Sequence, residues 1–273
     1  MKSSDQENGG SGQKGASSAR KPVIVTTSWD DGHRDDLRVA ELLRARKLPG
    51  TFYVTSGGLR DSSNMSAGDL RDLAAAGFEI GGHTVSHPVL TEISRDRVRR
   101  EVVDCKAELE AVLGMEVVSF AYPKGEFNAA VVTEVKQAGF RCARGVRMLS
   151  FACSFPPFEM PVTIQAHPHR WPTYWKNLIK RGEIVALARS SIVIGKSANW
   201  VELGKALFDC ALQEGGAWHL VGHSWETEKQ NGWTELKEML DYVSGRPGVR
   251  YMTNGELGQF VAAQSRPAQK SPV

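Results

Sequence analysis

The strongest constraint on the fold is a regular alternation of short apolar, β-branched runs with amphipathic segments of helical length. The first apolar run covers 23–27, the first amphipathic segment covers 35–46, and the pattern repeats along the chain. Strands separated by helices of this length predict a largely parallel sheet. With about seven such units and no second block of distinct composition, we expect one closed or nearly closed β/α barrel. A doubly wound open sheet is the alternative.

The expected elements follow from this periodicity and from capping residues. We expect strands at 23–27, 51–55, 78–81, 116–121, 140–143, 217–221 and 249–252. We expect helices at 35–46, 68–76, 94–113, 128–138, 200–214, 233–244 and 254–263.

The two ends of the chain differ in composition from its centre. Residues 1–20 are polar and rich in Gly and Ser, so they are expected to form a flexible leader. Residues 265–273 are expected to form a flexible tail. The folded domain is therefore predicted to cover 21–264.

Charge and hydropathy exclude several classes of protein. The net charge of +3 is too small to indicate a nucleic-acid partner, and basic and aromatic residues are not interleaved. No segment has the apolar run of a signal peptide or the ~20 apolar residues of a membrane span. We therefore expect a cytoplasmic protein without a membrane span, whose four scattered cysteines are reduced and mostly buried.

A pair of carboxylates, Asp30 and Asp31, follows the first predicted strand. Neighbouring side chains on a strand point to opposite faces, so the two can share a site only if the chain turns there, and Gly32 allows that turn. Two ionised carboxylates in one pocket repel each other unless a cation intervenes. An Asp-Gly turn or a helix N-cap is the structural alternative.

A pair of histidines, His83 and His87, follows the third predicted strand. Glycines precede the pair and Pro88 disfavours helix at His87, so a tight loop is expected. Two imidazoles and one carboxylate suit zinc, cobalt or iron and leave positions open for water and substrate. Metal-assisted hydrolysis is the favoured chemistry; surface histidines and a non-haem iron oxygenase are the alternatives.

A third histidine-bearing strand end lies later in the chain. His219 and His223 have the same parity on the predicted strand 217–221 and its end, so both can face inward. We expect His223, at the strand end, to be the functional residue, and His219 to be packed or hydrogen-bonded beneath it. Histidine titrates in the range needed to protonate a leaving amine near neutral pH.

Four motifs occur together in a fixed order: Thr27-Ser28-Trp29-Asp30-Asp31-Gly32, His83-Thr84-Val85-Ser86-His87-Pro88, Phe120-Ala121-Tyr122-Pro123-Lys124-Gly125 and Leu220-Val221-Gly222-His223. In this order they resemble the motifs of the polysaccharide deacetylases, the NodB-homology carbohydrate esterases of family 4. The resemblance implies a single domain folded as a distorted (β/α)₇ barrel, which hydrolyses the acetyl group from an N-acetylated amino sugar.

The resemblance also implies roles for individual residues. Asp30 would be the general base and His223 the general acid. Asp31, His83 and His87 would hold a divalent metal ion, with zinc expected first and cobalt or another divalent ion as alternatives. A backbone N–H in the Tyr122–Lys124 turn would stabilise the oxyanion, so Tyr122 and Lys124 are assigned to the oxyanion or substrate.

The chain departs from the family pattern at three points. Trp29 stands where the family usually has phenylalanine, and no Asp-x-x-Asp-Trp motif is evident. Ala121 stands where the family usually has an arginine that orients the base. Arg144 either supplies this guanidinium or is an ordinary surface arginine.

Other residues are candidates for the surroundings of the site. His33, Trp225 and Glu226, together with Trp233, either line a sugar-binding groove or pack the barrel.

The segment 148–196, rich in proline and aromatic residues, is expected to be an insertion that shapes substrate entry, because long connections in compact domains are usually functional. Within it, His167 and His169 are either hydrogen-bonded loop residues or ligands of a second metal.

The predicted partner is a carbohydrate, chitin-like or peptidoglycan-like, with no nucleic-acid partner. One alternative keeps the hydrolase and changes the substrate to another non-peptide amide: a formamide, a ureide or a lipid-linked amino sugar. The other alternative is a catalytically inactive glycan-binding module. The oligomeric state is not predicted.

Overall fold

A computed structural model describes residues 21–169 and 199–264 of the chain. Eight strands form one sheet: β1 Val23–Trp29, β2 Thr51–Val54, β3 Glu79–Gly82, β4 Ser119–Ala121, β5 Cys142–Arg144, β6 Ile164–Gln165, β7 Gly216–Gly222 and β8 Val249–Tyr251. Their order is β5-β4-β3-β2-β1-β7-β6, with β8 paired to β1, and all the paired strands are parallel. The expected parallel sheet is therefore confirmed.

Strand β1 pairs with three other strands of the sheet. Along its whole length it pairs with β7, from Val23 opposite Gly216 to Trp29 opposite Gly222. Its other edge is shared, because its first three residues pair with β8 and its last two with β2. All seven residues of β1 are buried, as expected of a strand that is covered on both faces.

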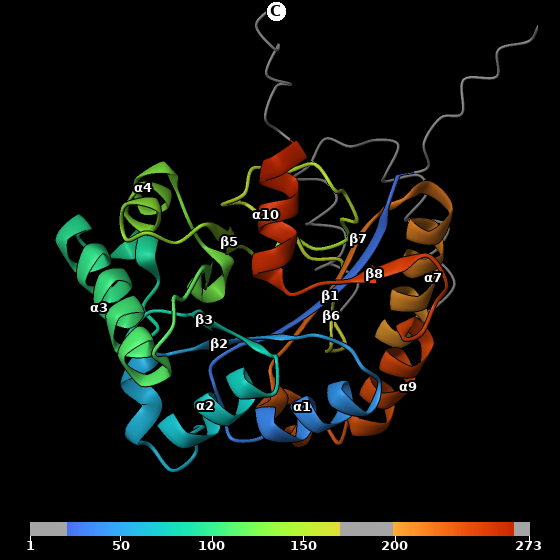
Figure 1. The fold of residues 1–273 in the computed structure, drawn as a ribbon, viewed down its shortest axis with the longest axis horizontal. Helices are drawn as coiled ribbons and strands as arrows, with labels where there is room; N and C mark the ends of the chain where they lie inside the picture. Colours follow the sequence, from blue (N-terminus) through green and yellow to red (C-terminus); the bar gives the residue numbers. More distant parts are fainter. Residues whose placement is uncertain (1–20, 170–198, 265–273) are drawn as a thin grey trace, which may run out of the picture.

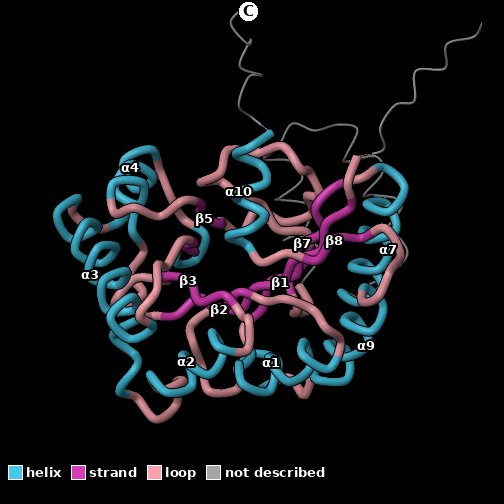
Figure 2. Tube along the Cα trace, viewed as in Figure 1, coloured by secondary structure: helices cyan, strands magenta, loops and turns pink. Residues whose placement is uncertain are grey.

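The helices surround a curled sheet. They are α1 Asp36–Ala45, α2 Ala67–Ala75, α3 Arg95–Leu113, α4 Ala129–Gln137, α7 Trp200–Glu214, α8 Ser224–Lys229, α9 Trp233–Val243 and α10 Asn254–Gln264. In Figure 1, α3 and α4 lie on one side of the sheet, α1 and α2 beneath it, and α7 and α9 on the other side. Figure 2 shows the strands running through the middle of this ring of helices. This arrangement confirms a distorted β/α barrel in a single domain.

The chain between β5 and β6 connects the two ends of the sheet. Met160 forms backbone hydrogen bonds with Ala143 and Gly145 at β5, of 3.0 and 3.1 Å. Four residues after Met160, Ile164 pairs with Leu220 of β7. The described first part of the predicted 148–196 insertion thus belongs to the barrel wall, where no strand was expected. The rest of that segment, 170–196, lies outside the described residues.

Local signals account for the helix ends. Ser66 and Asp69 form a capping box at the start of α2, and the Asn128 side chain caps α4 by accepting from the Val131 N–H. Gly114 ends α3 in the left-handed conformation with φ +67°. Ser94 occupies the expected N-cap position of α3, but its side chain makes no capping hydrogen bond. The predicted helices are present, and each end lies within one residue of its predicted position.

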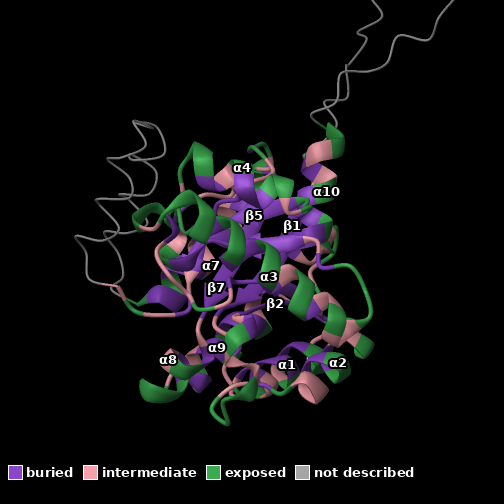
Figure 3. Cartoon of the chain, turned by 90° about the vertical axis from the view of Figure 1, so that its left-hand side faces the viewer, coloured by how far each residue is buried: buried purple, intermediate pink, exposed green. Residues whose placement is uncertain are grey.

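The buried apolar side chains form a large cluster, which includes Trp29, Phe52 and Trp218, and a separate smaller one around Ile24 and Leu257. Figure 3 shows the strands as buried and the outer faces of the helices as exposed. Cys105, Cys142 and Cys153 are free thiols, and Cys105 and Cys142 are buried. Among the described residues, no helix is long and apolar enough to cross a membrane.

Candidate active site

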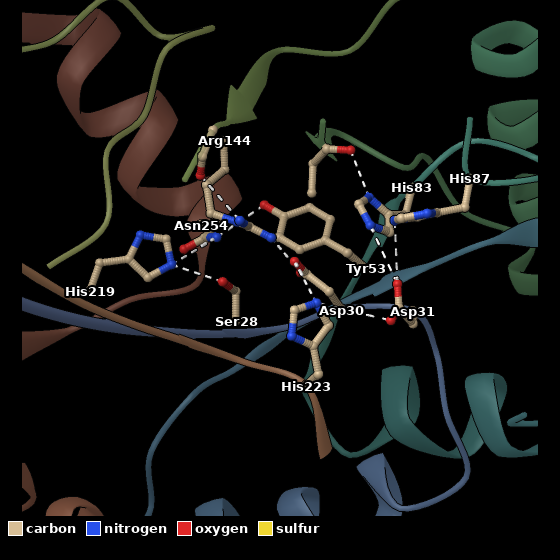
Figure 4. Close-up of polar contacts among 12 residues, drawn as sticks. Ser28, Asp30, Asp31, Tyr53, His83, His87, Arg144, His219, His223 and Asn254 are labelled. Carbon is tan, nitrogen blue, oxygen red and sulfur yellow. Dashed lines mark hydrogen bonds and ion pairs between the residues drawn. The ribbon is translucent and has the colours of Figure 1, made fainter. Parts of the chain in front are cut away.

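The carboxyl ends of β1, β3 and β7 bring the three predicted groups of side chains together. Asp30 and Asp31 follow β1, His83 and His87 follow β3, and His223 follows β7. In a parallel barrel these ends open onto one face. Figure 4 shows the five side chains gathered there, with Arg144 behind Asp30.

The three predicted metal ligands converge. The Asp31 Oδ1 atom lies 3.7 Å from His83 Nε2 and 3.6 Å from His87 Nε2. One donor atom from each residue lies within 4.8 Å of the others, and in the described parts of the chain no other His, Cys, Asp or Glu group meets this criterion. These residues are thus consistent with a divalent metal site.

The backbone of these loops is held in a sparsely populated conformation. Asp31, Thr84 and His87 have φ values of +79°, +68° and +58°, although none is glycine. Hydrogen bonds support the loops: Thr55 Oγ1 donates to the Asp31 carbonyl at 3.2 Å, and His87 N donates to Thr84 Oγ1 at 2.9 Å. The turn expected from Gly32 thus begins at Asp31 itself. Such local strain is often found at functional sites.

His83 is oriented for ligation by a hydrogen bond on the opposite side of its ring. Its Nδ1 lies 2.7 Å from the Ala121 carbonyl, which accepts the N–H and leaves the lone pair of Nε2 facing Asp31. Burial is the largest influence and lowers the pKa of His83 to about 4, so the imidazole is neutral near pH 7. A neutral imidazole held in this way suits zinc or another divalent ion.

Asp30 is buried and paired with Arg144, whose guanidinium donates to Asp30 Oδ1. Burial raises the pKa of Asp30, but the positive charges of Arg144, His83 and His223 outweigh it and lower that pKa to about 2. Arg144 is only 1% exposed, which excludes the surface-arginine alternative. It reaches Asp30 from the end of β5, 114 residues away in sequence.

A buried polar network lies behind Arg144. The guanidinium stands 5.2 Å from the Tyr53 ring centroid, and the Asn254 side chain donates to the Tyr53 hydroxyl at 3.0 Å. His219 lies 2.9 Å from Ser28 Oγ and 3.4 Å from the Asn254 amide (Figure 4). Burial lowers the pKa of His219 to about 3, so it is a neutral hydrogen-bonded residue inside the barrel.

His223, at the N-cap of α8, has a carboxylate partner in the first turn of that helix. Its Nδ1 lies 2.9 Å from Glu226 Oε2, and its Nε2 lies 4.0 Å from Asp30 and 3.9 Å from Asp31. Burial lowers the pKa of His223, but the hydrogen bond that its Nδ1–H donates to Glu226 and the charges of both aspartates raise that pKa to about 9. Glu226 thus supplies a carboxylate partner for this histidine, although the Asp-x-x-Asp-Trp motif is missing.

The Tyr122–Lys124 turn was expected to offer a backbone N–H to an oxyanion, and the structure restricts which residue can do so. The Tyr122 N–H donates to the Arg144 carbonyl at 3.1 Å, so it is not available to an oxyanion. The Tyr122 hydroxyl donates to Phe158 O at 3.1 Å, and its ring stacks on Phe127. Lys124 has φ +55° at the exposed side of the turn, and its N–H makes no hydrogen bond within the described residues. Lys124 is therefore the remaining candidate donor.

Of the residues predicted to surround the active site, some contact its central residues and others do not. The Trp225 indole N–H donates to Asp31 Oδ2 at 2.9 Å, so Trp225, like Glu226, contacts the central residues. His33 instead contacts its own loop through Asp35. Trp233 is buried beneath Arg38, so for Trp233 the packing alternative is correct.

His167 and His169 are hydrogen-bonded loop residues. His167 Nδ1 lies 2.5 Å from the Gln230 amide nitrogen, and His169 Nε2 lies 2.7 Å from Gln165 Oε1. Within the described ranges they form no group of metal-ligand geometry. These contacts support the hydrogen-bonded alternative for both histidines.

One buried residue near the site was not anticipated. Asp36, in the first turn of α1, is 0% exposed, and neither carboxylate oxygen has a hydrogen-bond partner within the described chain. Burial, reinforced by the charges of Asp30 and Asp31, raises its pKa well above the usual value. Asp36 lies on the buried face of α1 with Val39, Ala40 and Leu43. That i, i+3, i+4, i+7 spacing was the signal for its burial, whereas Leu37, one residue after Asp36, is only partly buried.

Asp36→Asn is expected to gain stability relative to the parent as the pH rises. The folded state holds the Asp36 proton more tightly than the unfolded state, so the parent loses stability above pH 3.8 until the folded-state pKa is reached. The loss amounts to at most about 1.4 kcal/mol per pH unit. Urea unfolding of the metal-free proteins between pH 4 and 8 measures this, with the half-exposed Asp35→Asn as control. If the free energies of unfolding of the parent and of Asp36→Asn change in parallel with pH, the expectation is wrong.

Sequence comparisons identify the family that this chain resembles. Residues 17–143 match the family model described as polysaccharide deacetylase. Over 119 residues the chain is 26% identical to a chitooligosaccharide deacetylase of Rhizobium leguminosarum bv. trifolii, covering 43% of this chain and 54% of that protein. Over 124 residues it is 24% identical to a peptidoglycan-N-acetylmuramic acid deacetylase of Bacillus subtilis, covering 44% and 46%. The chain thus matches about half the length of these curated relatives.

The fold is also found among solved structures. A protein from Mycobacterium smegmatis assigned to the polysaccharide deacetylases superposes with a TM-score of 0.66 at 19% identity. The match covers 93% of this chain and 96% of that one, so the similarity extends over the whole barrel.

Proposed function

Because the chain belongs to the polysaccharide deacetylase family, we propose that it is a metal-dependent hydrolase that removes the acetyl group from an N-acetylated amino sugar in an oligo- or polysaccharide. The observation that carries the proposal is the convergence of Asp31, His83 and His87, with Asp30 and His223 beside them. A ligand set, an ionised carboxylate and a protonated imidazole together meet the needs of amide hydrolysis.

Asp31, His83 and His87 would hold the metal ion, which we propose to be zinc, with cobalt or another divalent ion as alternatives. Imidazole and carboxylate ligands suit these ions. A divalent ion bound there would polarise the acetyl carbonyl and lower the pKa of a water molecule toward neutrality.

Asp30 and His223 divide the proton transfers between them. Their environments move their pKa values in opposite directions, to about 2 for Asp30 and about 9 for His223. Such opposed shifts are typical of a base and an acid that act in one reaction. We assign Asp30 to accept the proton of the attacking water and His223 to donate a proton to the departing sugar nitrogen.

Two further residues support these transfers in the proposed reaction. Arg144 keeps Asp30 ionised and fixes its orientation, taking the place of the arginine that the third motif lacks. The Lys124 N–H, on the same rim, would donate to the oxyanion that forms on the acetyl group.

The names of the curated relatives support two classes of glycan, chitooligosaccharide and peptidoglycan. We propose an N-acetylated glycan of one of these classes as the substrate. A cytoplasmic location and a role of the 148–196 segment in substrate entry stay predictions.

Acetate release from defined glycans tests the proposal. The purified protein, reconstituted with one equivalent of Zn²⁺ or Co²⁺, is incubated with chitotetraose and, separately, with peptidoglycan fragments. Acetate and a free amine should appear in equal amounts with one of the two. Glycan binding without any product would support the inactive glycan-binding module instead. If the protein turns over only formamide or ureide substrates, the assignment of an N-acetylated sugar as substrate is wrong, but the assignment as a hydrolase stands.

A further inference from the structure

Trp225 combines two features that packing alone does not explain. It is one of four large hydrophobic residues classed as exposed in the described chain, with 36% of its surface accessible. Its indole N–H is nevertheless fixed, because it donates to Asp31 Oδ2 at 2.9 Å. An exposed aromatic side chain is thus held in place by a predicted metal ligand.

This hydrogen bond distinguishes the two oxygens of Asp31. Oδ1 is the atom that faces the histidines, 3.7 Å from His83 Nε2 and 3.6 Å from His87 Nε2. Oδ2 accepts the indole N–H of Trp225. The carboxylate therefore cannot rotate without breaking that bond, and Oδ1 stays directed at the histidines. Partners of this kind, which bind the ligand rather than the metal, commonly strengthen metal affinity.

The ring of Trp225 also borders the proposed acid. Its centroid lies 5.6 Å from that of His223, with the planes tilted by 51°. The partly exposed indole of Trp225 therefore lies beside the imidazole of His223. A flat apolar surface beside polar reacting groups suits the apolar face of a pyranose ring.

We propose that Trp225 positions Asp31 for metal binding through its indole N–H and carries a substrate sugar ring on its exposed face. This inference rests on the proposed function, because it requires a metal at Asp31 and an amino sugar at His223. The two roles belong to different parts of the side chain, so they can be separated by substitution.

Trp225→Phe keeps an aromatic ring and removes the N–H, whereas Trp225→Ala removes both. Trp233→Phe is the matched control, because it removes the indole N–H of a buried tryptophan that donates to Glu228 instead. Zinc affinity is measured by competition with a chromogenic chelator, and KM by acetate release from chitotetraose at saturating zinc. Circular dichroism checks that each variant is folded.

Trp225→Phe should bind zinc about 10-fold more weakly than the parent, with KM within about twofold of the parent value. Trp225→Ala should show the same loss of zinc affinity and a KM raised about 10-fold. Parent-like zinc affinity in Trp225→Phe would overturn the positioning role, and parent-like KM in Trp225→Ala would overturn the sugar-binding role. A parent protein that binds no zinc, or releases no acetate from any glycan, would instead refute the proposed function.

Discussion

Asp30→Asn is expected to slow acetate release by about 10²–10⁴-fold, the range in which a general base contributes to catalysis. Asparagine has nearly the same shape as aspartate, and its amide oxygen can still accept from Arg144, but it cannot take a proton from water. The proposed metal ligands are unchanged, so the zinc content should equal that of the parent. Initial rates at saturating substrate, together with zinc analysis of the same sample, measure both quantities.

Asp35→Asn is the matched control for Asp30→Asn, since it makes the same chemical change on the half-exposed loop after β1. It should retain parent activity. An Asp30→Asn protein that keeps more than a tenth of the parent rate would show that Asp30 is not the base. Loss of zinc in that variant would instead place Asp30 among the ligands.

Arg144→Met is expected to destabilise the protein by about 3–5 kcal/mol, because it leaves the Asp30 charge buried without its partner. Arg144 and Asp30 are 1% and 4% exposed, so water cannot replace the lost guanidinium. Urea unfolding of the metal-free protein gives the change in free energy. The substitution should also raise the pKa of Asp30, since the main influence that opposes burial is removed.

The double variant Asp30→Asn/Arg144→Met separates this ion pair from general packing. With the buried charge removed, the double variant should regain most of the stability that Arg144→Met loses. The coupling energy of the double-mutant cycle formed by the parent, the two single variants and the double variant should therefore be large. If the free energy of unfolding of Arg144→Met lies within about 1 kcal/mol of the parent value, the ion pair does not stabilise the site as described.

The fold could be predicted because its signals are local. Helices such as α7 and α9 carry their periodicity and end signals in their own residues, and their predicted bounds agree with the structure to within one residue. Strand β6 has only two residues and is recognisable only through its pairing with β7. Helix α8, with the sequence Ser-Trp-Glu-Thr-Glu-Lys, has no apolar periodicity and was not expected.

The site was predictable to the extent that its residues are neighbours in sequence. Asp31, His83 and His87 stand in two short motifs at strand ends, and the structure brings them together. The position of Arg144 depends on pairing between β4 and β5, which a sequence pattern does not specify, so its two alternatives stayed open. The contact between Glu226 and His223 depends on α8, and it was missed with that helix.

Titration of zinc into the metal-free protein, with bound zinc and acetate release followed in the same samples, tests whether hydrolysis depends on a metal held by Asp31, His83 and His87. We expect no acetate release without metal, a rise in proportion to bound zinc, and saturation at one equivalent. His87→Ala, which removes a half-exposed ligand, should bind zinc far more weakly and lose activity in parallel. Full acetate release from the metal-free protein, or one tightly bound zinc in His87→Ala, would contradict the account.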